Sequence, residues 1–600
     1  MNDTGGTPLH WGIKSRHDVQ EYISRGFYVN ANDVYGSSAL HYAADRVNIE
    51  CMIALLVNGA HVDAVNNFGD TPLHMTIENK RSFRAIQCLI VFGADFNQPN
   101  GRNETPLHTI GHRMKKTNGH NNHDNDDDGY DAHLLFLLHS VGAKRCAVTK
   151  SAKKECSDGC DYFGDYIGSA SSMENSTKTY KLILSENVKT IVKSVFKIGE
   201  SVVAVANIFS LMKKPSLNMP IDQHPSCLDI KSEEYIQNVL DNLLNICSRK
   251  EIDNCENDYG DVERPMPERL LCLDGGGIRG LILIQMLIEI EEIAQVSIIS
   301  LFDWIAGTST GGMLALAIGM GKTMSECRSI YLLLKNEIFR GPRPYSSECM
   351  EMILKNIFGA ETSMADLNPS PKLIITGVIA DRSPTKLHLF RNYTSPNNKF
   401  LPDCYQLTKC KTPSLNEQLV WKAARATSAA HTYFHSFESF LDGALFANNP
   451  TIDAMAEIYE YNMAMYSAGY GCKMGSTMKC VVSLGTGHSS TTKTDIVDFQ
   501  YSISKNPTEL GRTMMGLYKT ATMVLSQACE SNNHIVSRAR AWCSSIGTQY
   551  FRFNPNLGDE IVLDETDDIT LIDMMFKTKV YMHLNKLKVT EMVKCLVKNK

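Results

Sequence analysis

"LCLDGGGIRGLILIQML" (271–287) reads as a short apolar run, a glycine-rich turn and an apolar helix. A turn of backbone N–H groups at the start of a helix favours negative charge, because the amides and the helix dipole point toward the bound group. The stretch alone does not say whether that charge is a nucleotide phosphate or an oxyanion formed during a reaction. The rest of the chain has to decide between them.

The composition is that of an ordinary globular chain. It has 600 residues, of which 43% are hydrophobic and 21% charged, and a formal net charge of -6. This length predicts roughly three or four domains, and the acidic balance disfavours a nucleic-acid partner. The eighteen cysteines are scattered, and the start "MNDTGGTPLH" lacks a signal peptide. We therefore expect a cytoplasmic protein with free thiols.

The N-terminal part repeats. Blocks such as "DTPLH" and "ETPLH" place His10, His41, His74 and His108 at spacings of 31, 33 and 34. The pattern resembles the ankyrin repeat, which has a period of about 33 residues and stacks because no single repeat buries its apolar face alone. We expect an all-α array over residues 1–145 and interpret the four histidines as structural.

An acidic insertion at 111–131 interrupts the fourth repeat. Asp124, Asp126 and Asp128 match the first half of a calcium-binding EF-hand loop. The twelfth loop position should supply a bidentate carboxylate, and Leu135 stands there. The sequence therefore predicts a solvated acidic loop rather than a metal site.

The second half of the chain has a different pattern. After a connecting region at 146–265, apolar runs alternate with longer helical stretches from residue 266 onward. This alternation predicts a mainly parallel sheet covered on both faces, within a domain over 266–490 that is followed by a helical extension over 491–600. We expect its strands at 269–274, 297–307, 372–381 and 479–487.

"WIAGTSTGGMLALAIGM" (304–320) contains a candidate nucleophile. Gly307-Thr308-Ser309-Thr310-Gly311 fits Gly-x-Ser-x-Gly between an apolar strand and an apolar helix. Such a turn needs small residues on either side of the serine, because the chain bends too sharply for larger side chains. Ser309 is the predicted nucleophile, with Gly307 and Gly311 forming its elbow.

A serine nucleophile also needs a base. Asp442 is followed by glycine and alanine in "SFLDGALFANNPTIDAM" (439–455), although an Asp-Gly pair by itself indicates only a β-turn. An ordinary Ser–His–Asp arrangement would instead use a downstream histidine, with His488 and His534 as candidates. The residues alone leave both bases open.

Taken in order, the glycine-rich turn, the serine turn and the Asp-Gly pair resemble the patatin-like lipid acyl hydrolases. With the ankyrin array in front, the chain is similar to the group VI calcium-independent phospholipases A2. The resemblance implies a three-layer α/β hydrolase domain in which Ser309 is the nucleophile and Asp442 the base of a Ser–Asp dyad. It also implies an oxyanion hole at Gly275, Gly276, Gly277 and Arg279.

The nucleotide interpretation of the opening turn becomes the weaker one. "GGGIRG" matches Gly-x-Gly-x-x-Gly, but a dinucleotide fold needs an acidic residue at the end of the next strand. Glu289, Glu291 and Glu292 lie near the required distance, within a helical stretch. A phosphate-binding P-loop needs Lys and then Ser or Thr after its last glycine, where Leu281 and Ile282 stand.

The resemblance implies an intracellular phospholipase that cleaves fatty-acyl esters, at sn-2, through an acyl-enzyme and without calcium or a cofactor. Two other hypotheses stay open: a non-catalytic ankyrin adaptor with an inactive hydrolase domain, and a Ser–His–Asp esterase. All three motifs of the hydrolase are present, which argues against the adaptor.

Three segments suggest partners. The stretches 509–530 and 583–600 are of a kind found in calmodulin targets and membrane-surface contacts, and the family includes calmodulin-regulated members. The apolar window 198–214, flanked by lysines, fits a helix lying on a membrane or an ordinary core helix. The expected partners are a phospholipid membrane, bound peripherally, with calmodulin and a second copy of the chain as further candidates.

Overall fold

The structure is a computed structural model that describes the two ends of the chain. Residues 5–144 are described with gaps at 14–15, 79–81 and 111–125. Residues 268–597 are described with gaps at 395–413, 468–477, 490–512, 559–560 and most of 518–530. The predicted connecting region, with its apolar window, lies outside the described residues.

Paired short helices build the N-terminal array, as the repeats predict. The Nδ1 atom of each of His10, His41 and His74 lies 2.9 Å from a hydroxyl at the start of its own helix, and the Nε2 atom lies 3.1 Å from a backbone oxygen near the start of the next repeat. The structural interpretation of these histidines is confirmed. The helices are α1 (Pro8–Trp11), α2 (Arg16–Ser24), α3 (Ala39–Asp45), α4 (Ile49–Val57), α5 (Pro72–Glu78), α6 (Phe83–Val91) and α8 (Asp126–Ser140).

The predicted acidic loop at 111–131 is wrong from Asp126 onward, whereas its earlier residues lie outside the described part of the chain. Helix α8 begins at Asp126, so the last part of the insertion is helical. Asp126 and Asp128 therefore do not stand in a calcium-binding loop, because the EF-hand loop coils around its ion and a regular helix does not.

A mainly parallel sheet forms the second domain. Its order is β4-β3-β2-β1-β6-β8, and β5 pairs with β3. Strands β1, β2, β3, β6 and β8 run parallel, whereas β4 and β5 are antiparallel to β3. The strands are β1 (Arg269–Leu273), β2 (Trp304–Gly307), β3 (Lys372–Ile379), β4 (Lys386–Arg391), β5 (Phe440–Asp442), β6 (Cys480–Leu484) and β8 (Gln549–Phe553), with a separate pair β7 (His488–Ser489) and β9 (Asn556–Gly558).

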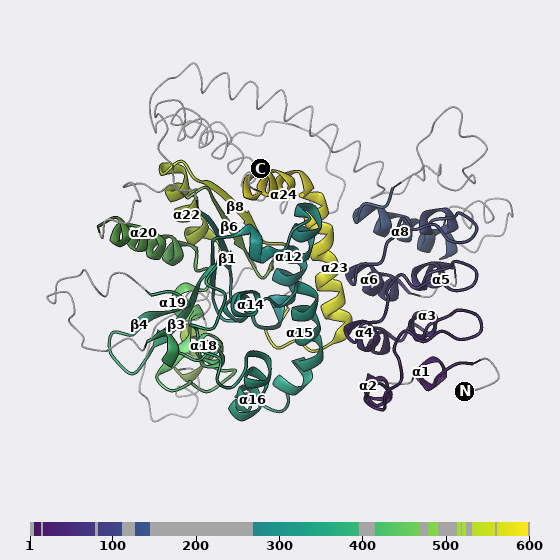
Figure 1. Ribbon diagram of the computed structural model, residues 1–600, viewed down its shortest axis with the longest axis horizontal. Helices are drawn as coiled ribbons and strands as arrows, with labels where there is room; N and C mark the ends of the chain where they lie inside the picture. Colours follow the sequence, from purple (N-terminus) through teal and green to yellow (C-terminus); the bar gives the residue numbers. More distant parts are fainter. Residues whose placement is uncertain are drawn as a thin grey trace, which may run out of the picture.

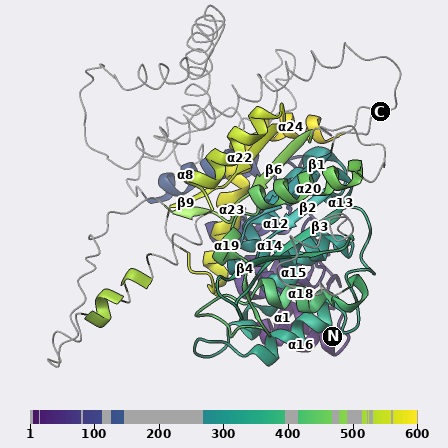
Figure 2. The ribbon, with the colours of Figure 1, turned by 90° about the vertical axis from the view of Figure 1, so that its left-hand side faces the viewer.

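Helices cover both faces of this sheet, because alternate strand residues point to opposite sides. Leu271 and Leu273 belong to one buried cluster, whereas Leu270 and Cys272 belong to another. Figure 2 looks at the sheet from the side of α20 (Thr451–Ser467) and α22 (Asn533–Ser545). The predicted three-layer α/β class is confirmed. The other face carries α12 (Gly280–Ala294), α14 (Thr310–Gly319), α15 (Met324–Ile338), α16 (Ser347–Phe358), α18 (Val420–Thr427), α23 (Asp568–Leu584) and α24 (Lys586–Leu596).

Two predicted boundaries differ from the structure. In the run 297–307, residues Ile298–Leu301 form the short helix α13, and the strand begins at Trp304. The Glu291 carboxylate accepts a hydrogen bond from the Ile298 amide at 2.9 Å and so supports a helical turn that a short apolar run cannot reveal. The extension over 491–600, expected to be helical, also supplies β8, which completes the sheet beside β6.

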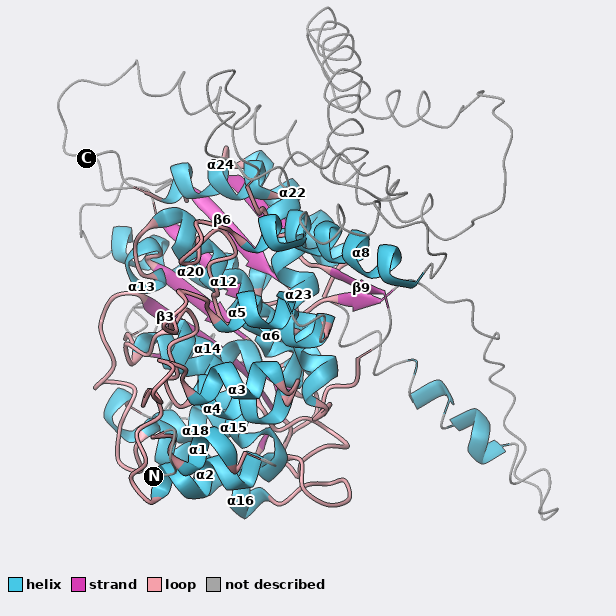
Figure 3. Ribbon diagram, turned by 90° about the vertical axis from the view of Figure 1, so that its right-hand side faces the viewer, coloured by secondary structure: helices cyan, strands magenta, loops and turns pink. Residues whose placement is uncertain are grey.

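The array packs against the α/β domain through the second helix of its repeats. Helices α4 and α6 face α23 and α15, while α1, α3 and α5 lie on the far side (Figures 1 and 3). Arg84 of α6 pairs with Asp573 of α23 at 2.7 Å, and Arg328 of α15 donates to the Val91 carbonyl at 2.6 Å. Helix α15 therefore lies between the array and the interior of the α/β domain.

Candidate active site

Ser309 stands at the tip of the turn between β2 and α14. Its backbone angles, a φ of 52° and a ψ of −121°, lie in a region that residues other than glycine rarely adopt. A Cβ at Gly307 would lie 2.3 Å from the Gly311 carbonyl oxygen, and one at Gly311 would lie 2.3 Å from that of Leu273. The sharp turn therefore requires glycine on both sides of the serine, as a nucleophile elbow does.

Asp442 ends β5 and meets the serine across 133 residues of sequence. The Ser309 Oγ donates to its Oδ2 at 2.7 Å, and the Ala444 amide donates to its Oδ1 at 2.8 Å. The carboxyl is 2% exposed. Burial raises its pKa to about 7, and the two hydrogen bonds oppose that rise. A carboxyl that titrates near neutral pH next to a serine hydroxyl can act as a general base.

The glycine-rich turn faces Ser309. A Cβ at Gly275 would lie 3.3 Å from that of Ser309. Of the three glycines expected to form the oxyanion hole, Gly275 is already used, because its amide donates to the Asn448 carbonyl at 3.0 Å. Among the described residues no hydrogen bond uses the Gly276 or Gly277 amide. Of the three expected glycine donors, Gly275 is therefore not available in this structure, since closing the turn uses its amide, and Gly276 and Gly277 stay predictions.

Residues far along the chain hold this turn. The Thr486 hydroxyl donates to the Gly275 carbonyl at 2.8 Å, and the Ile278 amide donates to the Leu563 carbonyl at 2.8 Å. Arg552 of β8 donates to Asp274, the residue before the glycines, at 2.7 Å. Sequence reasoning missed these supports, because no local pattern around them indicates contact with the turn.

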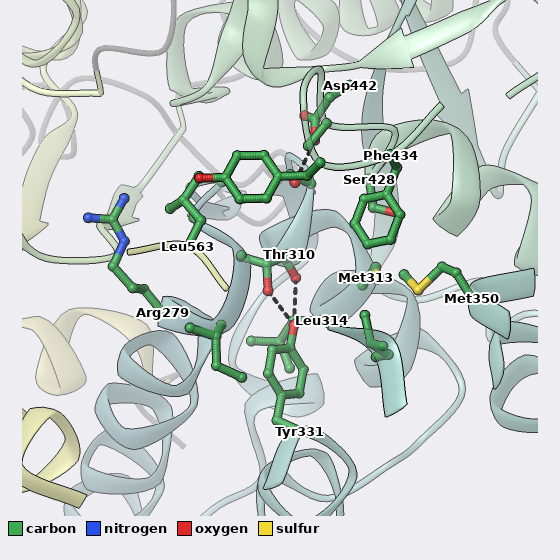
Figure 4. A pocket seen from close by; sticks show the side chains of 18 of the residues that line it. Arg279, Thr310, Met313, Leu314, Tyr331, Met350, Ser428, Phe434, Asp442 and Leu563 are labelled. Atoms are coloured by element: carbon green, nitrogen blue, oxygen red, sulfur yellow. Dashed lines mark hydrogen bonds between the residues drawn. The ribbon is translucent and has the colours of Figure 1, made fainter. Parts of the chain in front are cut away.

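An apolar cavity of about 230 Å³ opens below the dyad. In Figure 4, Asp442 lies at its top and Tyr331 at its bottom, where the tyrosine hydroxyl contacts Thr310. Arg279 and Leu563 lie on the side opposite Phe434 and Met350. Such a cavity suits a hydrocarbon chain whose carbonyl end reaches the serine. Its apolar lining includes Met313, Ala317, Ile330, Leu334, Met350 and Ile353.

Comparisons with known proteins find relatives for both parts of the chain. Residues 271–455 match the family model of the patatin-like phospholipases, and 40–110 match ankyrin repeats. The 85/88 kDa calcium-independent phospholipase A2 of Mus musculus is 46% identical over 337 residues, 56% of this chain and 41% of that protein. The intracellular phospholipase A2 of Caenorhabditis elegans is 28% identical over 552 residues, 91% of this chain and 43% of that protein.

The chain carries a patatin-like phospholipase domain behind an ankyrin-repeat array. The combination confirms the resemblance to group VI calcium-independent phospholipases A2. The chain spans less than half the length of these curated relatives. The match to the family model ends at residue 455, before β6, β8 and the Leu563 segment that support the glycine-rich turn of the patatin-like domain.

The histidines considered as alternative bases lie elsewhere. His488 is in β7 and His534 is in the first turn of α22, and neither lines the cavity of the patatin-like domain. His431 does line it, and burial lowers its pKa. The hydrogen-bond partner of the Ser309 Oγ is Asp442, which favours the dyad over a Ser–His–Asp arrangement.

The structure describes only part of the two candidate calmodulin-binding segments. Most of 509–530 lies outside the described residues. In 583–600, the apolar side of α24 is buried against the patatin-like domain through Val589, Met592, Val593 and Leu596. The suggestion that 583–600 contacts calmodulin or a membrane surface therefore gains no support from α24, because tertiary packing already covers its apolar side.

Proposed function

We propose that this chain is a calcium-independent phospholipase that hydrolyses a fatty-acyl ester of glycerophospholipids, with the sn-2 ester as its substrate. The hydrogen bond from the Ser309 Oγ to a buried Asp442, at the top of an apolar cavity, carries the proposal. The described residues contain no cluster of three or more potential metal ligands and no helix able to cross a membrane. The proposed reaction needs only side chains and backbone amides of the patatin-like domain.

The first half of the reaction acylates the serine. Asp442 accepts the Ser309 hydroxyl proton as Oγ attacks the ester carbonyl carbon. The amides of Gly276 and Gly277 donate to the oxyanion of the tetrahedral intermediate, with Arg279 beside the turn as a further cation. The ester C–O bond then breaks, Asp442 returns the proton to the lysophospholipid oxygen, and the acyl group stays on Ser309.

The second half releases the fatty acid. Asp442 takes a proton from water, whose oxygen attacks the acyl carbonyl, and the same amides hold the new oxyanion. Breakdown of this intermediate returns the proton to Ser309 and frees the carboxylic acid. The nucleotide alternative gains no support, because Gly276 and Gly277 line the same apolar cavity as Ser309.

Two exposed apolar side chains support peripheral attachment to a cytoplasmic membrane surface. Phe446, four residues after Asp442, is 49% exposed, and Val562, next to the cavity-lining Leu563, is 48% exposed. Apolar side chains next to a lipid cavity can enter the headgroup region and shorten the path of the substrate. No specific observation supports calmodulin or a second copy of the chain as a partner.

The deciding experiment measures fatty-acid release from phosphatidylcholine vesicles in EGTA. Wild type should be active, whereas Ser309→Ala and Asp442→Ala should each lose several orders of magnitude in turnover, because the dyad acts as a unit. His488→Ala and His534→Ala serve as controls and should retain turnover. Loss of activity in these controls, with survival of Asp442→Ala, would show a Ser–His–Asp esterase. A wild type without activity would favour the adaptor.

A further inference from the structure

The conformation of Ser309 needs outside support. Its φ of 52° with a ψ of −121° is a strained combination that persists only where the surroundings hold it. Its neighbour Thr308 is held through its hydroxyl, which donates to the Ala447 carbonyl at 2.5 Å and accepts from the Thr376 hydroxyl at 2.8 Å. The Ser309 carbonyl accepts the Met313 amide at 2.9 Å, which leaves the Ser309 amide to be held by another group.

That group is Thr427, the last residue of α18. The Ser309 amide donates to the Thr427 Oγ1 at 2.9 Å, and Thr427 is fully buried. A Cβ at Gly312 of α14 would lie 3.0 Å from the Thr427 methyl and 3.0 Å from its hydroxyl oxygen, so the threonine packs closely against the helix that follows the nucleophile. The interaction also occupies the Ser309 amide, which is therefore not a donor for the oxyanion.

The same segment holds the base. Two residues after Thr427, the Ala429 carbonyl accepts a hydrogen bond from the Asp442 amide at 3.0 Å. The segment 427–429 therefore contacts the backbone of the nucleophile through a side chain and the backbone of the base through a carbonyl. Ser309 follows β2 and Asp442 ends β5, and these two strands are not hydrogen-bonded to each other.

We propose that Thr427 is a positioning residue of the dyad: its Oγ1 fixes the strained backbone of Ser309 so that the serine hydroxyl points at Asp442. The proposal rests on the proposed function, because it assigns a role within the same reaction. Without the acceptor, the Ser309 amide would be buried and unpaired, and the elbow would relax toward a less strained conformation. The serine oxygen would then move relative to both the carboxylate and the glycine-rich turn.

The test compares two substitutions of one residue. Thr427→Val keeps the shape and removes the acceptor, whereas Thr427→Ser keeps the acceptor and removes a methyl group. Thr578→Val is the matched control: Thr578 is also fully buried, and its hydroxyl donates to the Met574 carbonyl within α23 at 2.9 Å. For each protein we would measure kcat and KM on phosphatidylcholine mixed micelles, the rate of Ser309 labelling by a fluorophosphonate, and the melting temperature.

Thr427→Val should lower kcat and the labelling rate by about 10- to 100-fold, the effect of displacing a catalytic group by about an ångström. Its KM should stay within about twofold of wild type, because the cavity that binds the acyl chain is unchanged. Thr427→Ser should recover most of the turnover, and Thr578→Val should lose melting temperature without losing kcat. A general loss of packing would not produce this split between kcat and KM.

Three outcomes would overturn the proposal. Wild-type turnover in Thr427→Val would show that the hydrogen bond is dispensable. Equal losses in Thr427→Val and Thr427→Ser would assign the effect to the methyl group, and an equal loss of kcat in Thr578→Val would assign it to stability. Failure of the proposed function looks different, because wild type itself would then neither hydrolyse phospholipid nor react with the fluorophosphonate.

Discussion

Asp442, the proposed base, is a buried carboxyl that is hydrogen-bonded to a serine hydroxyl. Removal from water raises its pKa to about 7, and the donors Ala444 N–H and Ser309 Oγ–H keep the charged form accessible. A base is most effective when its pKa lies near the working pH, since it is then ionised often enough and still accepts a proton readily. The environment of this one carboxyl therefore sets the pH at which the site can work.

The first prediction concerns the pH dependence of this carboxyl. Fatty-acid release should rise with pH through about 7 and then level off, because only ionised Asp442 can accept the Ser309 proton. The check is a kcat/KM profile on phosphatidylcholine between about pH 5 and 9, on either side of that pKa. A flat profile over this range would remove Asp442 as the titrating base.

The free energy of unfolding should also depend on the protonation of Asp442, but it should fall as pH rises. Because the pKa of Asp442 is raised in the folded state, its contribution is fully present below the unfolded value of about 3.9 and is lost as pH rises through about 7. Asp442→Asn should therefore melt higher, relative to wild type, at pH 8 than at pH 5. Ser309→Ala, which keeps the carboxyl, should retain most of the wild-type pH dependence of melting.

Gly276 provides the second prediction. Its φ is 169°, which other residues adopt, so backbone strain is not the reason for glycine here; the left-handed φ of 57° belongs to Gly277. A Cβ at Gly276 would instead lie 2.3 Å from the Thr486 hydroxyl oxygen. Gly276→Val should push the amides off the oxyanion and lower kcat by about a hundredfold while vesicle binding stays near wild type.

The measurement for Gly276→Val pairs turnover on phospholipid vesicles with ATP binding by calorimetry, for wild type and variant. Gly321→Val is the control, because no atom lies within 4 Å of a Cβ at Gly321, although its φ of 78° carries a strain cost. Preserved turnover in Gly276→Val, together with lost ATP binding, would favour the nucleotide interpretation of the turn.

At the scale of elements, a segment from the C-terminal part closes the site. Residues 561–567 cross from β9 to α23, and the Leu563 carbonyl accepts the Ile278 amide next to the oxyanion turn. Asp564 anchors the segment: its carboxylate accepts two hydrogen bonds from Arg343, at 2.7 and 2.6 Å, and one from the Tyr345 hydroxyl at 2.5 Å. These contacts connect the segment to the loop between α15 and α16.

The third prediction concerns this anchor. Asp564→Ala should lower turnover several-fold and increase backbone hydrogen exchange in 561–567, since the segment loses three charge-assisted hydrogen bonds. Asp381→Ala is the control, because Asp381 pairs with Arg382 on an exposed turn away from the cavity. An Asp564→Ala protein with unchanged exchange and turnover would show that the segment is held by Leu563 and α23 alone.

At the scale of the whole molecule, the array and the α/β domain share an interface along α23 and α15. Asp568 at the start of α23 pairs with Lys335 of α15 at 3.2 Å and with Arg16 of α2 at 3.4 Å. Lys335 also lines the cavity. The array therefore packs against α23 and the outer side of α15, whose inner side lines the apolar cavity, while the helices α1, α3 and α5 face away (Figure 3).

The fourth prediction tests this docking. Arg84→Glu should place two carboxylates at the position of the 2.7 Å ion pair with Asp573, lower the melting temperature and raise hydrogen exchange in α6 and α23. Adding Asp573→Asn should remove the repulsion, so that the melting temperature and the hydrogen exchange both move back toward their wild-type values. Arg102→Glu is the control, since Arg102 pairs within the array with Glu78 and Glu104. Equal effects of Arg84→Glu and Arg102→Glu would show that the ion pair between Arg84 and Asp573 does not stabilise the interface.

The sequence by itself determined the class of each domain and the identity of the dyad candidates. The repeat period predicts the array, and the strand–turn–helix patterns around Gly275 and Ser309 predict a parallel α/β domain, because both signals are local. Short apolar runs were less informative. The run 297–307 was expected to be a strand throughout, and the hydrogen bond to Glu291 that makes part of it helical comes from a neighbouring element.

Only the tertiary structure decided how the site is assembled. It brings Asp442 to Ser309 across 133 residues, uses the Gly275 amide to close its own turn, and places Thr427, Thr486 and Leu563 around the two turns. It also buries the apolar side of α24, which by sequence alone could have been a free amphipathic tail. Contacts between distant segments depend on the packing of whole elements, and no local pattern encodes which side chain meets which turn.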